Sequence, residues 1–92
     1  MIMSMKQNLI KEFKDAKYLE MIYKLKAQHT TLTHQVEYYC ACAFREEAIS
    51  EALERCFSVT DKRNLIPKLV AECENVAKTH FFIYDMANES EG

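Results

Sequence analysis

The sequence predicts an all-α protein, and three observations support this prediction. The 92 residues include one glycine, Gly92, and one proline, Pro67, whereas the turns of a sheet recruit many such residues. Alanine, leucine, methionine, glutamate and lysine, which are good helix formers, are abundant. Apolar residues also recur at helical spacing over three long segments. We therefore expect one domain, residues 1–92, folded as a small three-helix up-down-up bundle that oligomerisation or a helical partner could complete.

The first helix is expected over residues 4–28. Ser4 is its expected N-cap, without the reciprocal partner that would complete a capping box. Its apolar stripe consists of Leu9, Phe13, Ala16, Leu19, Ile22 and Tyr23. The segment "AQHTTLTHQ" then interrupts the pattern, because threonines are stiff at χ1 and their hydroxyls compete for backbone hydrogen bonds. We place a turn near residues 28–31; a kink there instead would fuse two helices into a rod that would have to dimerise.

The second helix is expected over residues 32–57 and is apolar on two sides. Its main stripe consists of Leu32, Val36, Tyr39, Cys42, Ala43, Ile49, Leu53 and Cys56. A second strip consists of Ala41, Phe44, Ala48 and Ala52. A helix that is apolar on two sides is usually packed on two sides, so we expect it to be the middle member of the bundle.

The third helix is expected over residues 65–87, after a break at "SVTDKRN", a segment rich in cap and turn formers. Pro67 falls in its first turn, where the missing N–H costs nothing. Its stripe alternates spacings of three and four, as in a coiled coil, and consists of Ile66, Leu69, Cys73, Val76, His80, Ile83 and Ala87. Residues 88–92 are a polar tail.

The cysteines are expected to be mainly core residues rather than a metal or redox site. Cys40 and Cys42 are two apart, so on a helix their side chains point away from each other and cannot bind one ion. Cysteine also behaves as a small buried hydrophobe. One alternative stays open, a structural metal site assembled across helices from Cys42, Cys56, Cys73 and His80.

No residue pattern in the sequence names a reaction, so we expect no enzyme, no catalytic residues and no cofactor. His80 has no carboxylate or nucleophile in its stripe and is expected to be a satisfied interior histidine. The acidic cluster that contains Glu46 and Glu47 is interpreted as a solvated helix face, with Glu46 placed to pair with a lysine of the first helix.

Methionine and aromatic residues near the two ends of the chain form the most functional-looking feature, because such side chains suit adaptable binding surfaces. The residues expected to bind a partner are Met3, Met5, Phe81, Phe82, Tyr84 and Met86. The partner would be another helical protein or a second copy of the chain. The alternative is that these residues simply close one end of the bundle.

Charge is unevenly distributed. Residues 1–30 carry six lysines against three acids, whereas residues 31–92 carry six basic residues against eleven acidic ones. We expect a basic first helix that complements an acidic remainder, and a nucleic-acid-binding first helix is the alternative. Residues such as Lys11, Lys14 and Lys17 would carry that binding, but acids interrupt them and no arginine supports them.

The sequence therefore predicts a small cytoplasmic protein–protein interaction module, acting as an adaptor, regulator, chaperone-like factor or small subunit. The start "MIMSM" is too short for the core of a signal peptide, and no apolar run is long enough to span a bilayer. Four cysteines without a secretory signal fit reduced thiols in a cytosol-like compartment.

Overall fold

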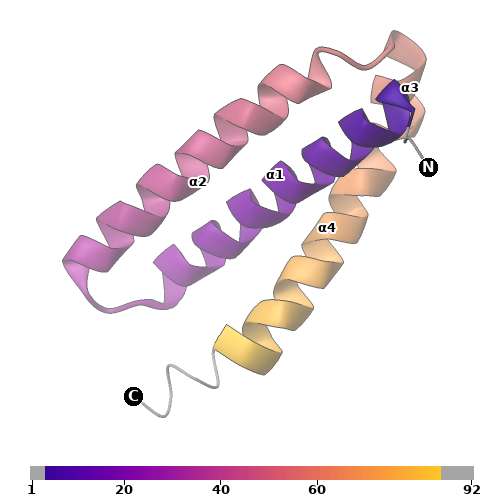
Figure 1. Cartoon of the computed structure of the whole chain (residues 1–92). Coiled ribbons are helices and arrows are strands. Elements are labelled where there is room, and N and C mark those ends of the chain that lie inside the picture. The colour runs from indigo at the N-terminus through magenta and orange to yellow at the C-terminus, as the bar shows by residue number, and fades with distance from the viewer. Residues whose placement is uncertain (1–3, 86–92) are drawn as a thin grey trace.

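A computed structural model describes residues 4–85 and confirms the all-α class. The elements are α1 (Met5–His29), α2 (Thr33–Glu54), the short α3 (Val59–Asn64) and α4 (Ile66–His80), which continues as the π-helical turn η1 (Phe81–Asp85). The three long helices run up, down and up (Figure 1). The turn expected near residues 28–31 lies at residues 30–32, so α1 and α2 are separate helices.

Helix α1 begins with a complete capping box, which we did not expect. The Ser4 hydroxyl accepts a hydrogen bond from the Gln7 N–H at 3.1 Å, and the Gln7 side chain accepts one from the Ser4 N–H at 3.0 Å. The amide of Gln7 supplies the reciprocal bond that a glutamate often makes. Two otherwise unpaired N–H groups are therefore satisfied, which fixes the start of the helix.

The break at "SVTDKRN" is a short helix rather than a loop, and α2 ends at Glu54 rather than at residue 57. Ser58 caps α3 by accepting a hydrogen bond from the Asp61 N–H at 3.1 Å. The polar residues that favour turns are also the strongest N-caps, so this sequence is compatible with a loop and with a short helix. Pro67 lies in the first turn of α4, as expected, and Leu65 is the N-cap without a side-chain bond.

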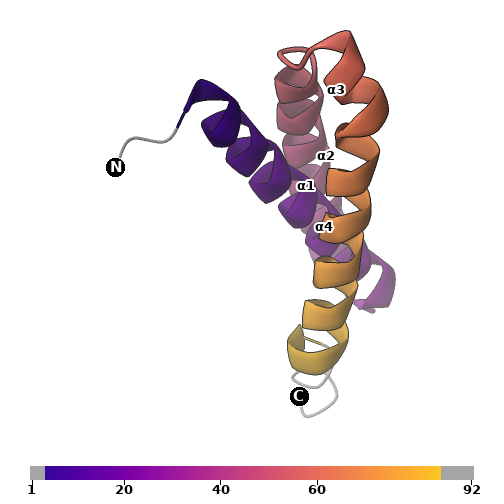
Figure 2. The same cartoon turned by 90° about the vertical axis from the view of Figure 1, so that its right-hand side faces the viewer.

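The middle helix is α1, not α2. Helix α1 packs along both α2 and α4, whereas α2 and α4 make almost no contacts with each other within residues 4–85. Figure 1 shows α1 alongside α2, and Figure 2 shows α1 crossing α4 diagonally. Because α2 is packed on one side only, the expectation that both of its apolar strips are covered is wrong.

The diagonal crossing also changes the buried face of α4. Ala77 and Phe81 are buried, whereas Val76 and Ile83, which the heptad-like stripe places in the core, are more than half exposed. Residues four apart stay on nearly one side of a straight helix. The buried side of α4 therefore runs through Cys73, Ala77 and Phe81. The predicted seam is therefore right at Ile66, Leu69 and Cys73 and wrong at Val76 and Ile83, and Ala87 lies outside the described residues.

Two small apolar clusters hold the helices together. The first joins buried Phe13, Phe57, Ile66 and Leu69, with the rings of Phe13 and Phe57 edge to face at 5.8 Å. The second joins buried Ile22, Ala77 and Phe81. The clusters lie toward opposite ends of α1, so each one fixes a different end of the crossing between α1 and α4.

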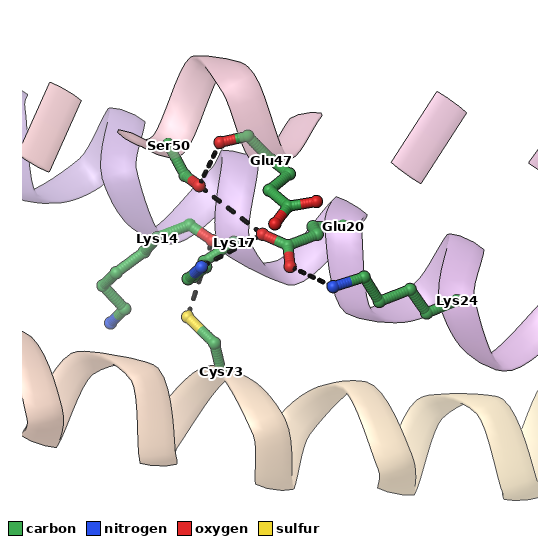
Figure 3. Close-up of polar contacts among 7 residues, drawn as sticks. All are labelled: Lys14, Lys17, Glu20, Lys24, Glu47, Ser50 and Cys73. Atoms are coloured by element: carbon green, nitrogen blue, oxygen red, sulfur yellow. Dashed lines mark hydrogen bonds and ion pairs between the residues drawn. The ribbon is translucent and has the colours of Figure 1, made fainter. Parts of the chain in front are cut away.

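A polar contact between α1 and α2 is centred on Glu20 (Figure 3). The Glu20 carboxylate, only 5% exposed, lies 3.1 Å from Lys17 Nζ and 2.7 Å from Lys24 Nζ. On the α2 side, the buried Ser50 hydroxyl lies 3.5 Å from Glu20 Oε1 and donates to the Glu47 carbonyl at 2.9 Å. A buried carboxylate is tolerated when it is paired and hydrogen-bonded, and Glu20 meets both conditions.

The pKa of the Glu20 carboxyl is set by two opposing effects. Burial raises this pKa, but hydrogen bonds from Lys24 and Lys17 outweigh burial, so the pKa lies below its ordinary value of 4.5. A carboxyl whose pKa is lower in the folded state stabilises the fold above the unfolded-state pKa. This contribution is lost as the pH falls through the lowered, folded-state pKa.

Replacing Glu20 by glutamine is expected to lower the free energy of unfolding by about 1–3 kcal/mol near neutral pH, because both lysines lose a charged acceptor. Urea unfolding of the wild type and of Glu20→Gln, measured from neutral to strongly acidic pH, checks this. The difference between the two proteins should shrink as the acidic limit is approached, since the wild-type carboxyl is then neutral as well. A difference that stays constant with pH would contradict the assignment.

Candidate functional site

The candidate site is the outer face of α2, which we define as Ala41, Phe44, Ala48 and Ala52 with the flanking charges Glu37, Glu51 and Arg55. All seven residues are exposed, and the Phe44 ring is 73% exposed. The face points away from α1, because the residues of α2 that are buried, Ala43, Glu46 and Ser50, lie on the other side of the helix. Phe44, a large aromatic residue among alanines, is thus exposed to solvent.

The inner face of α2 explains why the aromatic points outward. Small residues such as Ala43 and Ser50 are buried there, and small residues let two helices approach closely. The aromatic pair on this side is Tyr23 with Tyr39, whose stacked rings lie 6.3 Å apart near the α1–α2 turn. The arrangement keeps α2 close to α1 and leaves Phe44 without a place in the core.

Phe44 also borders a shallow groove of about 400 Å³ between α1 and α2. The groove is lined by Lys24, Ala27, Gln28, Val36, Cys40, Ala43, Phe44 and Glu47. Lys24, one of the polar lining residues, is bonded to Glu20 at 2.7 Å. Most of the other lining residues are apolar.

The charges of the outer face are available to a partner. Glu37, Glu51 and Arg55 take part in no ion pair among the described residues. Glu37 and Arg55 are separated by eighteen residues, which is five full helical turns. Their side chains therefore leave the helix in the same direction, near its two ends.

The residues predicted to bind a partner do not form one surface. Met5 is 90% exposed at the start of α1, whereas Phe82 and Tyr84 are exposed in η1. Figure 1 shows these two places at opposite ends of the molecule, so the residues cannot close one end of the bundle together. Phe81 is completely buried and belongs to the core. Met3 and Met86 lie outside the described residues.

The basic residues of α1 are largely engaged within the fold. Lys14 Nζ lies 2.8 Å from Glu72 of α4, and Lys6 Nζ lies 3.2 Å from Asp61 of α3. The hydrogen bond to Glu72 raises the pKa of the Lys14 ammonium. Lys17 is bonded to Glu20. The basic helix thus complements acidic residues elsewhere in the same chain, and this arrangement gives no support to the nucleic-acid alternative.

The composite metal site is not formed. No group of three or more histidine, cysteine or acidic side chains is close enough to hold a metal ion in the part of the chain that the structure describes. Cys73 is buried, Cys42 is half-buried, and Cys40 and Cys56 are exposed, so the expectation that Cys56 is a core residue is wrong. Cys73 donates to the Lys14 carbonyl at 3.5 Å, and burial raises the pKa of its thiol, which is typical of a structural cysteine.

His80 is satisfied, as expected, and half-buried. Its Nδ1 lies 2.9 Å from the Tyr18 hydroxyl, and its ring meets the Tyr84 ring edge to face at 5.1 Å. Glu46 is buried, but the ion pair it makes in the described residues is with Arg45 at 3.8 Å rather than with a lysine of α1.

The second apolar strip was the sequence signal for the outer face of α2. The strip is visible in the sequence, but the pattern alone does not say whether the chain or a partner covers it. Of the residues buried against α1, Ala43 belongs to the main stripe, whereas Ser50 is polar and was not part of either strip.

Comparison with known protein families, with curated proteins and with solved structures finds no match for this chain. The described helices include none with the length and hydropathy that a bilayer span requires. The functional assignment must therefore come from the surface itself.

Proposed function

We propose that this protein is a protein–protein interaction module that binds a helical partner along the outer face of α2. The observation that carries the proposal is Phe44, a large aromatic that is 73% exposed in a strip of alanines on a helix packed on one side only. Aromatic residues surrounded by small ones are typical anchors at helix–helix interfaces, where the anchor fills a space on the partner.

The mechanism would be helix packing. Ala41, Ala48 and Ala52 let the axis of a second helix approach closely, and Phe44 enters the space between two of its turns. The charges of Glu37, Glu51 and Arg55 would then select the partner and set its register, since rim charges contribute more to specificity than to affinity. The role is one of binding rather than catalysis, as an adaptor, regulator, chaperone-like factor or small subunit.

A cytoplasmic location is part of the proposal. Cys40 and Cys56 are free and exposed, and such thiols persist where the compartment is reducing.

The proposal predicts that a photo-reactive residue at the edge of the outer face is cross-linked to a protein inside the cells that make this chain. Ala52 is the position for the probe, because it is exposed and leaves Phe44 in place. Lys68 on α4, which is also exposed, is the control position. Mass spectrometry of the full-length chain after illumination should show a cross-linked protein for the Ala52 probe and none for the Lys68 probe.

The opposite result would end the proposal. If the probe at Ala52 gives no cross-linked protein while a probe at Phe82 does, the binding surface is the end of α4 and not the outer face of α2.

A further inference from the structure

The outer face of α2 has the residue spacing of a coiled-coil seam. Its members alternate spacings of four and three along the helix: Glu37, Ala41, Phe44, Ala48, Glu51 and Arg55. This is the pattern with which one helix packs continuously along another. The seam extends from the second turn of α2 to Arg55, whose N–H is still bonded to the Glu51 carbonyl at 3.3 Å.

Two of the residue pairs of the seam are complementary about position 46, one in size and one in charge. Phe44 and Ala48 lie equally far from this position on either side, and so do Glu37 and Arg55. When two copies of the helix run antiparallel about this point, Phe44 of one lies opposite Ala48 of the other. Glu37 of one then lies opposite Arg55 of the other, at each end of the pair. Phe44 thus meets a small residue and Glu37 meets a base, while Glu51 lies opposite Ala41.

A parallel pairing lacks this complementarity. In a parallel pair in register each residue meets its own copy, so Glu37 would face a second Glu37 and Arg55 a second Arg55. Like charges in direct opposition destabilise an interface, whereas the antiparallel pair has opposite charges at both ends. The charge pattern therefore selects one orientation.

We propose that the partner of the outer face of α2 is a second copy of this chain, bound antiparallel with a two-fold axis at position 46. This inference rests on the proposed function, since it uses the same face. By symmetry each contact occurs twice, so the dimer contains two Phe44–Ala48 contacts and two Glu37–Arg55 ion pairs. Helix α1 covers the opposite side of α2, and α4 lies beyond α1, so neither obstructs the second copy.

The test is a pair of complementary charge reversals in the full-length chain, with association measured by sedimentation equilibrium. Glu37→Arg places two Arg–Arg contacts in the dimer, and Arg55→Glu places two Glu–Glu contacts in it. Each single variant should therefore self-associate at least about tenfold more weakly than the wild type. Lys68→Glu, a reversal on an exposed residue of α4, is the control and should associate as the wild type does.

Mixing the two single variants gives the decisive result. In the mixed dimer, the arginine introduced at position 37 of one chain faces the glutamate introduced at position 55 of the other. At the other end of the pair the native Arg55 and Glu37 face each other, so both ends are attractive. The mixture should associate about as strongly as the wild type. The double variant Glu37→Arg/Arg55→Glu should do so by pairing with itself, without a second variant present. Circular dichroism of each variant shows that its helices are retained.

The alternative outcomes separate this inference from the proposed function. A wild-type chain that stays monomeric, or single variants that associate like the wild type, would overturn the antiparallel dimer. If the probe at Ala52 nevertheless cross-links a different protein, the outer face of α2 still binds a partner and only the identity of the partner is wrong. A failure of both experiments would overturn both statements.

Discussion

Replacing Phe13 by alanine is expected to lower the free energy of unfolding by about 3–5 kcal/mol. The Phe13 side chain has no exposed surface and lies against Phe57, Ile66 and Leu69, where α1, α4 and the segment before α3 meet. Its removal leaves a cavity that three rigid elements cannot close. A domain of this size is stable by roughly 5–14 kcal/mol, so the variant should be close to unfolding. Urea unfolding followed by circular dichroism measures the change.

The matched control is the same substitution on the outer face of α2. At a protein concentration low enough for single chains, Phe44→Ala should change the free energy of unfolding by less than about 0.5 kcal/mol, because the ring makes no core contact. Equal destabilisation by the two substitutions would show that Phe44 belongs to a core and that the packing of α2 is wrong.

Replacing Phe44 by glutamate is expected to weaken self-association at least about a hundredfold while leaving the single chain folded. The substitution removes the aromatic anchor and places a carboxylate opposite Ala48, two residues from the two-fold axis, where no base lies opposite it. A buried unpaired charge is strongly unfavourable, and the two-fold symmetry introduces it twice. Phe44→Ala should have a smaller effect, since it removes the anchor without adding a charge.

The helices themselves could be predicted from the sequence. The near absence of glycine and proline, the threonine-rich break and the position of Pro67 place the three long helices and both connections within a few residues. The short α3 could not be distinguished from a loop, because Ser58 and Asp61 favour a turn and an N-cap equally well. The first capping box is also visible in the sequence, because Gln7 lies three residues after Ser4.

Packing was harder to predict than the helices. The stripe of α4 is correct at Leu69 and Cys73, but the crossing angle with α1 decides whether Val76 or Ala77 is buried, and no local pattern encodes that angle. For the same reason the sequence shows both apolar strips of α2 without showing which one α1 covers. Helix α1 covers the side that carries Ala43 of the main stripe together with Ser50, and the second strip is left outside.

The sequence predicts a protein-binding surface built on aromatic residues, and the structure adds the exposed Phe44 of α2 as a second candidate; which surface binds a partner stays a prediction. The predicted residues were instead at the two ends of the chain, where Phe81 proves to be core and Phe82 remains exposed. Phe81 and Phe82 are adjacent in "HFFIYDM", so the side of the helix that faces α1 decides which of them is buried. The diagonal crossing of α1 and α4 sets that side.

The outer face of α2 is tested most directly by the mass of the full-length chain in solution, measured by light scattering over a range of concentrations. Phe44→Glu and Phe82→Glu form a matched pair, because each places the same charge at an exposed phenylalanine, on α2 and at the end of α4 respectively. We predict a dimer for the wild type and for Phe82→Glu, and a single chain for Phe44→Glu. A dimer that survives Phe44→Glu but is lost in Phe82→Glu would contradict the account.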